Sequence, residues 1–299
     1  MIEVKNLTKY YGKKIAVNNL NFIVNKNEII GLLAPNGAGK STTMNIITGY
    51  IAPSSGDVII DPQIKIGYLP ENPPLYPDMK VIEYLKFVSE LKCADKNNLN
   101  DIMQKFKIDD VADKLIKNLS KGYKQRVGFA QALIGDPEIL ILDEPMSGLD
   151  PKQITEIRDL IKSLKENHTI LISSHILSEI DAIADRIIIL NKGEIVADAT
   201  TFELSKNFSR TPKIIVRIRG PHEKIIEQVK IFANIVESKK GIEDFATDLI
   251  LENKNEGDIR EKIFQFAKEN DFVLLMMKPF DVTLEEIFLQ VTEGDVQKC

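Results

Sequence analysis

The feature that most constrains this chain is the run Ala-Pro-Asn-Gly-Ala-Gly-Lys-Ser at residues 34–41. Its two glycines lack a Cβ, so backbone N–H groups can converge on an anion. The lysine and the hydroxyl that follow are the side chains that bind phosphate oxygens and Mg²⁺ in phosphate-binding loops. The run therefore predicts a site for ATP or GTP with Mg²⁺. The alternative, a glycine-rich turn without a ligand, leaves the Lys-Ser pair unexplained.

The segments on either side place this loop between a strand and a helix. Glu28 to Leu33 is short and apolar, as expected of a buried parallel strand, and a helical segment begins at Lys40. The pattern's first glycine is replaced by Ala34, which keeps the turn if its φ is negative. Lys40 would bridge the β- and γ-phosphates as a catalytic residue, and Ser41 would be a Mg²⁺ ligand. The expected nucleotide-binding residues of the loop are Asn36, Gly37, Ala38, Gly39, Lys40, Ser41 and Thr42.

A second apolar run, Glu138 to Leu142, ends in the two acidic residues Asp143 and Glu144. Open α/β sheets bind ligands at the carboxyl ends of their parallel strands, so we expect both carboxylates beside the phosphates. Asp143 would hold the Mg²⁺ shell directly or through water, and Glu144 would orient or deprotonate the attacking water. Many strands end in a polar turn, so the acidic pair alone is a weak indication of a catalytic site. The phosphate loop at Lys40 makes this interpretation stronger.

The composition suits an enzyme with one large α/β domain and a smaller one, since the 299 residues are 43% hydrophobic and 28% charged. The net charge of −5 gives no general basic surface, so nucleic acid is not an expected partner. Cys93 and Cys299 lie too far apart in sequence to indicate a metal knuckle. No apolar stretch approaches the ~20 residues of a membrane helix. We therefore expect a cytoplasmic protein that reaches a membrane only through a partner.

Between the two strands, the run Leu-Ser-Lys-Gly-Tyr-Lys-Gln-Arg at residues 119–126 precedes a helical segment. Together with the motifs above, it resembles the signature Leu-Ser-Gly-Gly-Gln of the ATPase subunits of ABC transporters. Ser120 and Gly122 match the serine and the second glycine, whereas Lys121 replaces the first glycine and Tyr123 the glutamine. The resemblance implies that this turn contacts the γ-phosphate held by a second copy in a head-to-tail dimer. The alternative is an ordinary helix capped by serine.

Further motifs of this family follow in the expected order. Tyr11 matches the aromatic residue that stacks on adenine, with neighbouring Tyr10 a core or surface residue. Glu71 stands where the family usually has a glutamine that contacts Mg²⁺ and the lytic water, although it also begins a proline-rich loop. Asp150 ends a run similar to the D-loop, which lies across the dimer interface. His175 follows an apolar run and matches the switch histidine that hydrogen-bonds the γ-phosphate.

The resemblance implies an α/β fold with a P-loop NTPase core of ABC type, an antiparallel β subdomain and an inserted helical subdomain. We expect this ATPase domain at residues 1–209, with the helical subdomain at about 72–135. A composition shift near Arg210 predicts a boundary, followed by a small C-terminal α+β accessory domain at 210–299. The segment Thr283 to Leu289 has a capping box and resembles the tail of ATPases that serve small exporter permeases.

These motifs imply an ATP-hydrolysing subunit that energises export through separate integral-membrane permease subunits, on the inner face of the cell membrane. Its ATPase partner would be an identical copy or a paralogue, and residues 72–91 would receive a short helix of the permease. Three other classes fit less well. A ribosome-associated protein would carry two such cassettes, and a DNA-repair ATPase would insert coiled coil or zinc cysteines. A nucleotide sensor without catalysis would not need all of Lys40, Asp143, Glu144 and His175.

Overall fold

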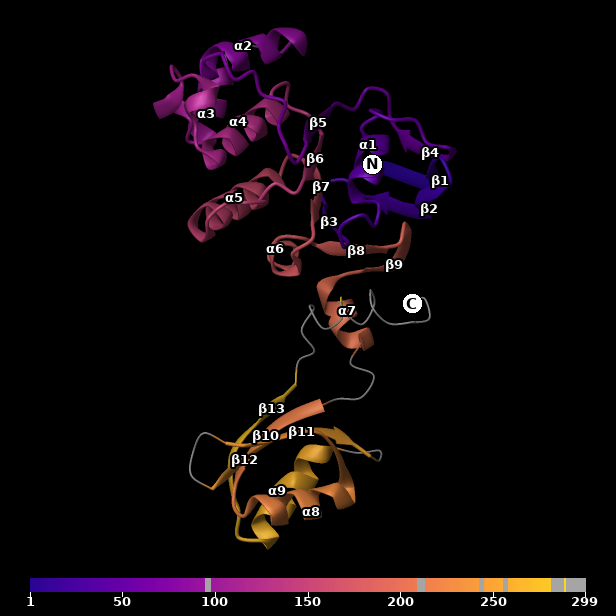
Figure 1. Ribbon diagram of the computed structural model, residues 1–299, viewed down its shortest axis with the longest axis vertical. Coiled ribbons are helices and arrows are strands. Elements are labelled where there is room, and N and C mark those ends of the chain that lie inside the picture. Colours follow the sequence, from indigo (N-terminus) through magenta and orange to yellow (C-terminus); the bar gives the residue numbers. More distant parts are fainter. Residues whose placement is uncertain (95–97, 209–212, 242–244, 255–257, 281–287, 289–299) are drawn as a thin grey trace. The chain divides into compact units, whose positions relative to one another are not determined.

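The computed structural model describes residues 1–94, 98–208, 213–241, 245–254, 258–280 and 288 (Figure 1). The chain divides into two compact units: Met1–Thr201 together with Phe288, and Phe202–Ile287. The boundary predicted at residue 210 and most of the predicted helix at Thr283 to Leu289 lie outside the described residues. Both therefore stay predictions.

The first unit is built on a six-stranded sheet with the strand order β5-β6-β7-β3-β8-β9. All neighbours in it are parallel except β8 and β9, which form an antiparallel hairpin. Its strands are β3 (Ile29–Leu33), β5 (Ile66–Leu69), β6 (Ile139–Asp143), β7 (Thr169–Ser174), β8 (Arg186–Asn191) and β9 (Glu194–Ala199). β3, β6 and β7 are buried throughout, as expected of apolar parallel strands that are covered on both faces. The P-loop core predicted from these runs is confirmed.

A second, antiparallel sheet has the order β2-β1-β4, and this confirms the predicted antiparallel β subdomain. Its strands are β1 (Ile2–Tyr11), β2 (Lys14–Val24) and β4 (Ser55–Ile60). Alternate residues of these strands, such as Ile2, Val4 and Val24, are buried in one apolar cluster with residues of β3, β6 and α1 (Lys40–Ile47). The cluster joins this sheet to the strand and the helix that flank residues 34–39.

The inserted helical subdomain is also confirmed. Figure 1 shows its α-helices gathered beyond β5, the edge strand of the parallel sheet. They are α2 (Val81–Leu91), α3 (Leu99–Lys105) and α4 (Lys121–Leu133), and two 3-10 turns, Asp109–Val111 and Ile116–Asn118, lie between α3 and α4. The core helices are α5 (Pro151–Leu164) and α6 (Leu177–Asp181).

Lys92, just after α2, supports the end of α4. Its Nζ donates hydrogen bonds to the carbonyl oxygens of Gln131 at 2.7 Å, Ile134 at 3.1 Å and Ala132 at 3.4 Å. The last carbonyl groups of a helix have no partner within the helix. The Lys92 ammonium supplies them with donors and also places a positive charge at the negative end of the α4 dipole.

The β8–β9 hairpin lies against the segment that follows β3. Gly193 at its turn donates its N–H to the Ala38 carbonyl at 3.1 Å and accepts the Asn18 N–H at 2.8 Å. The Asn18 side chain also donates to Glu194 at 2.7 Å. Gly193 has a φ of +84°, and a Cβ there would lie 2.9 Å from the Ala16 carbonyl oxygen. Only glycine fits this close backbone approach without strain.

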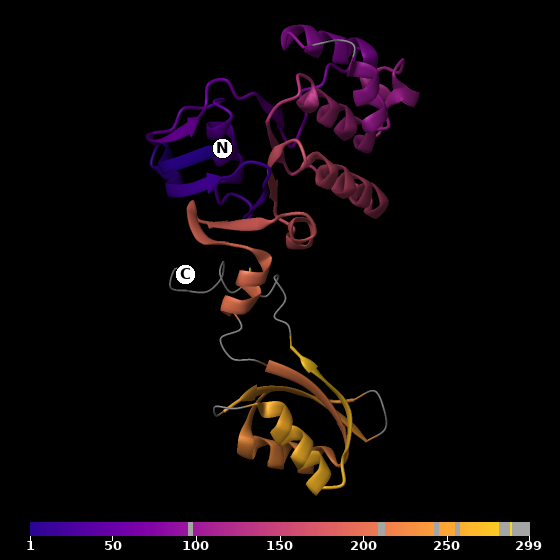
Figure 2. The same cartoon turned by 180° about the vertical axis from the view of Figure 1, so that it is seen from behind.

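The second unit has the element order β-α-β-β-α-β, and its antiparallel sheet has the order β11-β12-β10-β13. These elements are β10 (Lys213–Arg219), α8 (His222–Phe232), β11 (Ala233–Lys240), β12 (Ala246–Asn253), α9 (Ile259–Glu269) and β13 (Val273–Pro279). In Figure 2, α8 and α9 cover one face of this sheet. Their apolar sides form a core of their own with β10 and β12, so the predicted small α+β domain is confirmed. Before β10, α7 (Thr201–Phe208) begins at the end of the first unit.

Candidate functional site

The predicted phosphate loop bridges β3 and α1, as its sequence indicates. Gly37 and Gly39 have φ values of +79° and +110°, which side chains rarely tolerate. A Cβ on Gly39 would also lie 2.5 Å from the Ala16 carbonyl oxygen. Ala34 is fully buried and does not have a positive φ, so alanine fits where the pattern has glycine. Its carbonyl oxygen accepts a hydrogen bond from Lys40 Nζ at 2.6 Å.

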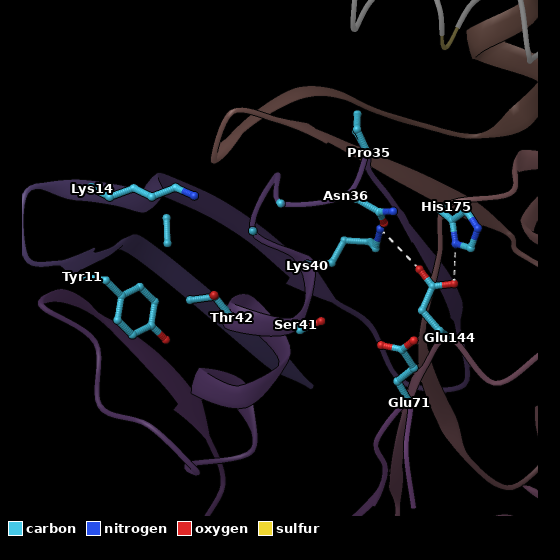
Figure 3. A pocket seen from close by; sticks show the side chains of 13 residues that line it. Tyr11, Lys14, Pro35, Asn36, Lys40, Ser41, Thr42, Glu71, Glu144 and His175 are labelled. Carbon is cyan, nitrogen blue, oxygen red and sulfur yellow. Dashed lines mark hydrogen bonds and ion pairs between the residues drawn. The ribbon is translucent and has the colours of Figure 1, made fainter. Parts of the chain in front are cut away.

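A cavity of about 360 Å³ opens over this loop (Figure 3). It brings together residues from five separate parts of the sequence. The predicted site residues that line it are Tyr11, Asn36, Gly37, Gly39, Lys40, Ser41, Thr42, Glu71, Glu144 and His175. In Figure 3, Tyr11 lies toward one end and Glu144 with His175 toward the other, with the loop between them. This extended arrangement has room for a base at one end and phosphates at the other.

Lys14 also lines the cavity, although it belongs to none of the predicted motifs. It lies directly opposite Tyr11 in the pairing of β1 with β2, across the turn at Gly12. The signal that could have found it is the hairpin itself, because a hairpin places the residue after its turn beside the residue before it. Lys14 adds a positive charge at the end of the cavity where Tyr11 lies.

Glu144 carries the main electrostatic contacts of the site. Its Oε1 lies 3.3 Å from Lys40 Nζ, and its Oε2 lies 2.8 Å from His175 Nδ1. Both Glu144 and Lys40 are only 7% exposed, so this ion pair is little screened by water. Glu144 also has a φ of +48°, an uncommon conformation for a residue with a side chain that often marks functional sites. From this backbone conformation the Glu144 carboxylate lines the cavity.

Asp143, unlike Glu144, does not line the cavity. It is buried, and its Oδ1 accepts a hydrogen bond from Ser173 Oγ at 2.5 Å. The same Ser173 Oγ accepts the Glu144 N–H at 3.0 Å. Ser173, near the end of β7, thus connects the two acidic residues at the end of β6, although it belongs to none of the predicted motifs.

The predicted magnesium ligands are Ser41, Asp143 and Glu71. Among the described residues, no group of three or more His, Cys, Asp or Glu side chains is arranged to hold a metal ion. The cavity lining does include the Ser41 hydroxyl and the Glu71 carboxylate, which are hard oxygen donors of the kind that Mg²⁺ prefers. Mg²⁺ is often held by one or two such groups together with substrate phosphates, so this donor set fits the ion.

The remaining predicted residues form a second group outside the cavity, except for Ala38, which belongs to the loop without lining it. Ser120 caps α4, with its Oγ accepting the Tyr123 N–H at 3.4 Å, and Lys121 and Gly122 form the first turn. Asp150 caps α5 by accepting the Gln153 N–H at 2.9 Å.

The starts of α4 and α5 lie against each other. A Cβ on Gly122 would lie 2.8 Å from the Gln153 side chain, and a Cβ on Gly148 would collide with Lys121 Nζ. Arg126 of α4 forms an ion pair with Glu156 of α5. The signature-like turn and the D-loop-like turn therefore form one surface of the unit. None of the helices in the described part of the chain is long and apolar enough to span a membrane.

Comparisons with known proteins place this geometry in a family. A family profile described as "ABC transporter" matches residues 17–147. The lantibiotic transport ATP-binding protein SrtF of Streptococcus pyogenes is 39% identical over 206 residues, which are 66% of this chain and 90% of that protein. The bacitracin transport ATP-binding protein BcrA of Enterococcus faecalis is 33% identical over 317 residues, covering 98% of this chain and 97% of that protein.

Solved structures agree with the sequence comparisons. The dimeric structure of MJ0796, a bacterial ABC transporter cassette, superposes with a TM-score of 0.62 at 28% identity. The match covers 67% of this chain and 98% of that one. The loop, the acidic pair and the histidine thus occur on the fold that these relatives share, and the chain belongs to the ABC transporter family as an ATP-hydrolysing, ATP-binding subunit.

Proposed function

We propose that this chain energises an exporter whose membrane-spanning permease is a separate polypeptide. BcrA and the linearmycin resistance protein LnrL of Bacillus subtilis each align with 98% of this chain, so the likeness extends through the second unit. Their printed names concern bacitracin transport and linearmycin resistance. Moving such compounds out of a cell is the work of an exporter, which supports this direction of transport for the present chain.

The observation that carries the proposal is the contact of Glu144 with both Lys40 and His175 inside one cavity. Bound triphosphate would attract Lys40 Nζ to its β- and γ-oxygens, in competition with Glu144. Glu144 would then accept a proton from a water molecule as the water oxygen attacks the γ-phosphorus and ADP leaves. His175 would hydrogen-bond the γ-phosphate. Mg²⁺, held by Ser41 and Asp143 with Glu71 nearby, would neutralise part of the charge on the phosphates.

The second group of residues would act on the nucleotide of another chain. Ser120, Lys121, Gly122 and Asp150 lie on one surface and do not line the cavity of their own chain. In a head-to-tail dimer this surface would cover the γ-phosphate bound by the partner. The dimeric form of the MJ0796 cassette supports this arrangement.

We place the permease contact at the segment before α2. Tyr76 is 53% exposed, and its ring centre lies 6.0 Å from that of Tyr84 and 5.6 Å from that of Phe87. An exposed aromatic side chain that packs on two further rings offers an apolar surface on which a short helix of the permease could bind. Such a contact would hold the chain on the inner face of the membrane.

Glu144→Gln tests the mechanism. The amide cannot accept the proton from water, so we expect ATP turnover to fall at least about 100-fold, in line with the loss of a general base. The protein should instead accumulate as an ATP-bound dimer, measured by size-exclusion chromatography with light scattering in Mg-ATP. The control is Lys40→Ala in the same background, which should bind no ATP and stay monomeric. A Glu144→Gln protein that remains monomeric at saturating Mg-ATP contradicts the proposal.

A further inference from the structure

The turn that carries His175 is held by one hydroxyl group. Ser174 Oγ accepts the Ile176 N–H at 2.9 Å and donates to Glu179 Oε2 at 2.7 Å. Since a serine hydroxyl has a single proton, its donation to Glu179 turns the oxygen lone pairs toward Ile176. His175 lies between Ser174 and Ile176, so the Ser174–Ile176 hydrogen bond closes the turn that carries the imidazole, and the contact with Glu179 fixes the hydroxyl that makes it.

Glu179, on α6, is an unusual residue for this position. It is only 6% exposed, although a buried carboxylate is costly unless charged or hydrogen-bonded groups compensate it. Burial raises the pKa of Glu179, and the Ser174 hydroxyl opposes this. Of the charged groups that face it, Glu144 raises the pKa further, while His175 and Arg158 lower it.

Arg158, on α5, does not compensate Glu179 by direct contact. Its Nε is buried and has no hydrogen-bond partner among the described residues. The Ser174 hydroxyl is thus the partner that orients the Glu179 carboxylate. The buried Glu179 carboxylate thus has one hydrogen-bond partner in the part of the chain that the structure describes, the hydroxyl of the residue next to His175. This contact indicates that Glu179 orients His175 through Ser174.

We propose that Ser174 and Glu179 are positioning residues that hold His175 in line with Glu144 and the γ-phosphate. This inference rests on the proposed role of His175. The chain of contacts runs from Glu179 through Ser174 to the His175 turn, and His175 Nδ1 then reaches Glu144 Oε2 at 2.8 Å. Loss of the hydroxyl frees the turn and lets the imidazole leave the γ-phosphate, without removing any group that binds the nucleotide.

The test measures kcat and KM for ATP in variants of the full chain. Ser174→Ala and Glu179→Met should each lower kcat by about tenfold while KM changes less than about twofold, because orientation and not binding is lost. Ser174→Thr keeps the hydroxyl, and Glu179→Gln keeps an acceptor oxygen, so both should retain most of the wild-type kcat. His168→Phe is the matched control. His168 is buried at the opposite end of β7, where its Nδ1 lies 2.7 Å from the Pro137 carbonyl oxygen, so this variant should lose stability but keep kcat.

A double-mutant cycle with His175→Ala separates positioning from general stability. In the His175→Ala background, Ser174→Ala and Glu179→Met should cause no further loss of kcat, because the residue that they position is gone. Equal losses with and without His175 overturn the inference. A His175→Ala protein with wild-type turnover instead contradicts the proposed role of His175, so the two failures are distinguishable. If Glu179→Met does not fold, the pair Ser174→Ala and Ser174→Thr decides the question alone.

Discussion

Tyr11 and Tyr10 are neighbours in β1 with different surroundings. Both are partly exposed, at 52% and 46%, but only Tyr11 lines the cavity over the phosphate loop. Successive side chains of a strand point to opposite faces, so the two rings leave the sheet on different sides. The Tyr11 ring also has Lys9 Nζ at 5.5 Å from its centre, a cation–π contact that steadies the exposed ring.

Tyr11→Ala should weaken ATP binding by about 1–3 kcal/mol, the usual value of stacking between a base and an aromatic side chain. The measurement is the Kd for a fluorescent ATP analogue in variants that keep the wild-type Lys40. Tyr10→Ala removes the same ring from the other side of the strand and should leave the Kd within about twofold. Equal losses in the two variants would show that strand stability, and not stacking, controls binding.

Residues were predictable from the sequence where the chemistry is local. The loop at residues 34–41 and the acids Asp143 and Glu144 occupy fixed positions relative to a strand end, so their placement at the carboxyl edge of the sheet follows from the pattern. Ser173 and Ser174 could not be singled out in this way. Their contacts depend on side chains of neighbouring elements, which a single strand pattern does not encode.

At the scale of elements, helix α4 is fixed at both ends. Ser120 caps its start, and Lys92 serves the carbonyl groups at its end. The capping serine could be predicted from the sequence, because an N-cap is local. Lys92 precedes the α4 carbonyls by about 40 residues, and only the packing of the helical subdomain brings them together.

Lys92→Met should lower the free energy of unfolding by about 1 kcal/mol, because the α4 carbonyls lose a charged donor and the helix end loses a favourable charge. Denaturant unfolding measures this loss. Lys86→Met, a matched exposed lysine within α2, should change stability by less than about 0.5 kcal/mol. An unchanged midpoint for Lys92→Met would mean that water satisfies these carbonyls equally well.

The apolar strands β3, β6 and β7 were predictable because burial on both faces demands a continuous apolar run. Strand β11 was not predicted. Its sequence ends in Glu-Ser-Lys-Lys, and most of its residues are exposed. It lies at the edge of its sheet, and its pairing with β12, not its own pattern, makes it a strand.

At the scale of the whole molecule, the two units have separate apolar cores. One contains residues of β1, β3 and α1, and the other contains Ile218, Ile263 and their neighbours in the second unit. Because the two cores share no residues, a substitution in one core can destabilise its own unit without destabilising the other. The nucleotide site lies entirely within the first unit.

Ile263→Ala should therefore lower the stability of the second unit by about 2–5 kcal/mol, the usual cost of emptying a buried isoleucine site. The Kd for ATP should remain unchanged. In thermal unfolding, Mg-ATP should raise the transition of the first unit only, because a ligand stabilises the part that binds it. Ile141→Ala, in the first core, is the converse control and should lower the transition that responds to ATP. A higher Kd for ATP in Ile263→Ala would show that the stability of the second unit affects nucleotide binding by the first.

The close fit of Gly193 against Ala16 and Ala38 limits how this chain can be engineered. In the sequence, the Lys192-Gly193 turn looks like a convenient surface site for a tag, a label or an inserted domain. In the fold, its backbone supports the phosphate loop from about 155 residues away along the chain. A fusion at this turn should therefore lower nucleotide affinity, whereas the connection between β11 and β12, which belongs to the other unit, offers a site remote from the loop in the sequence.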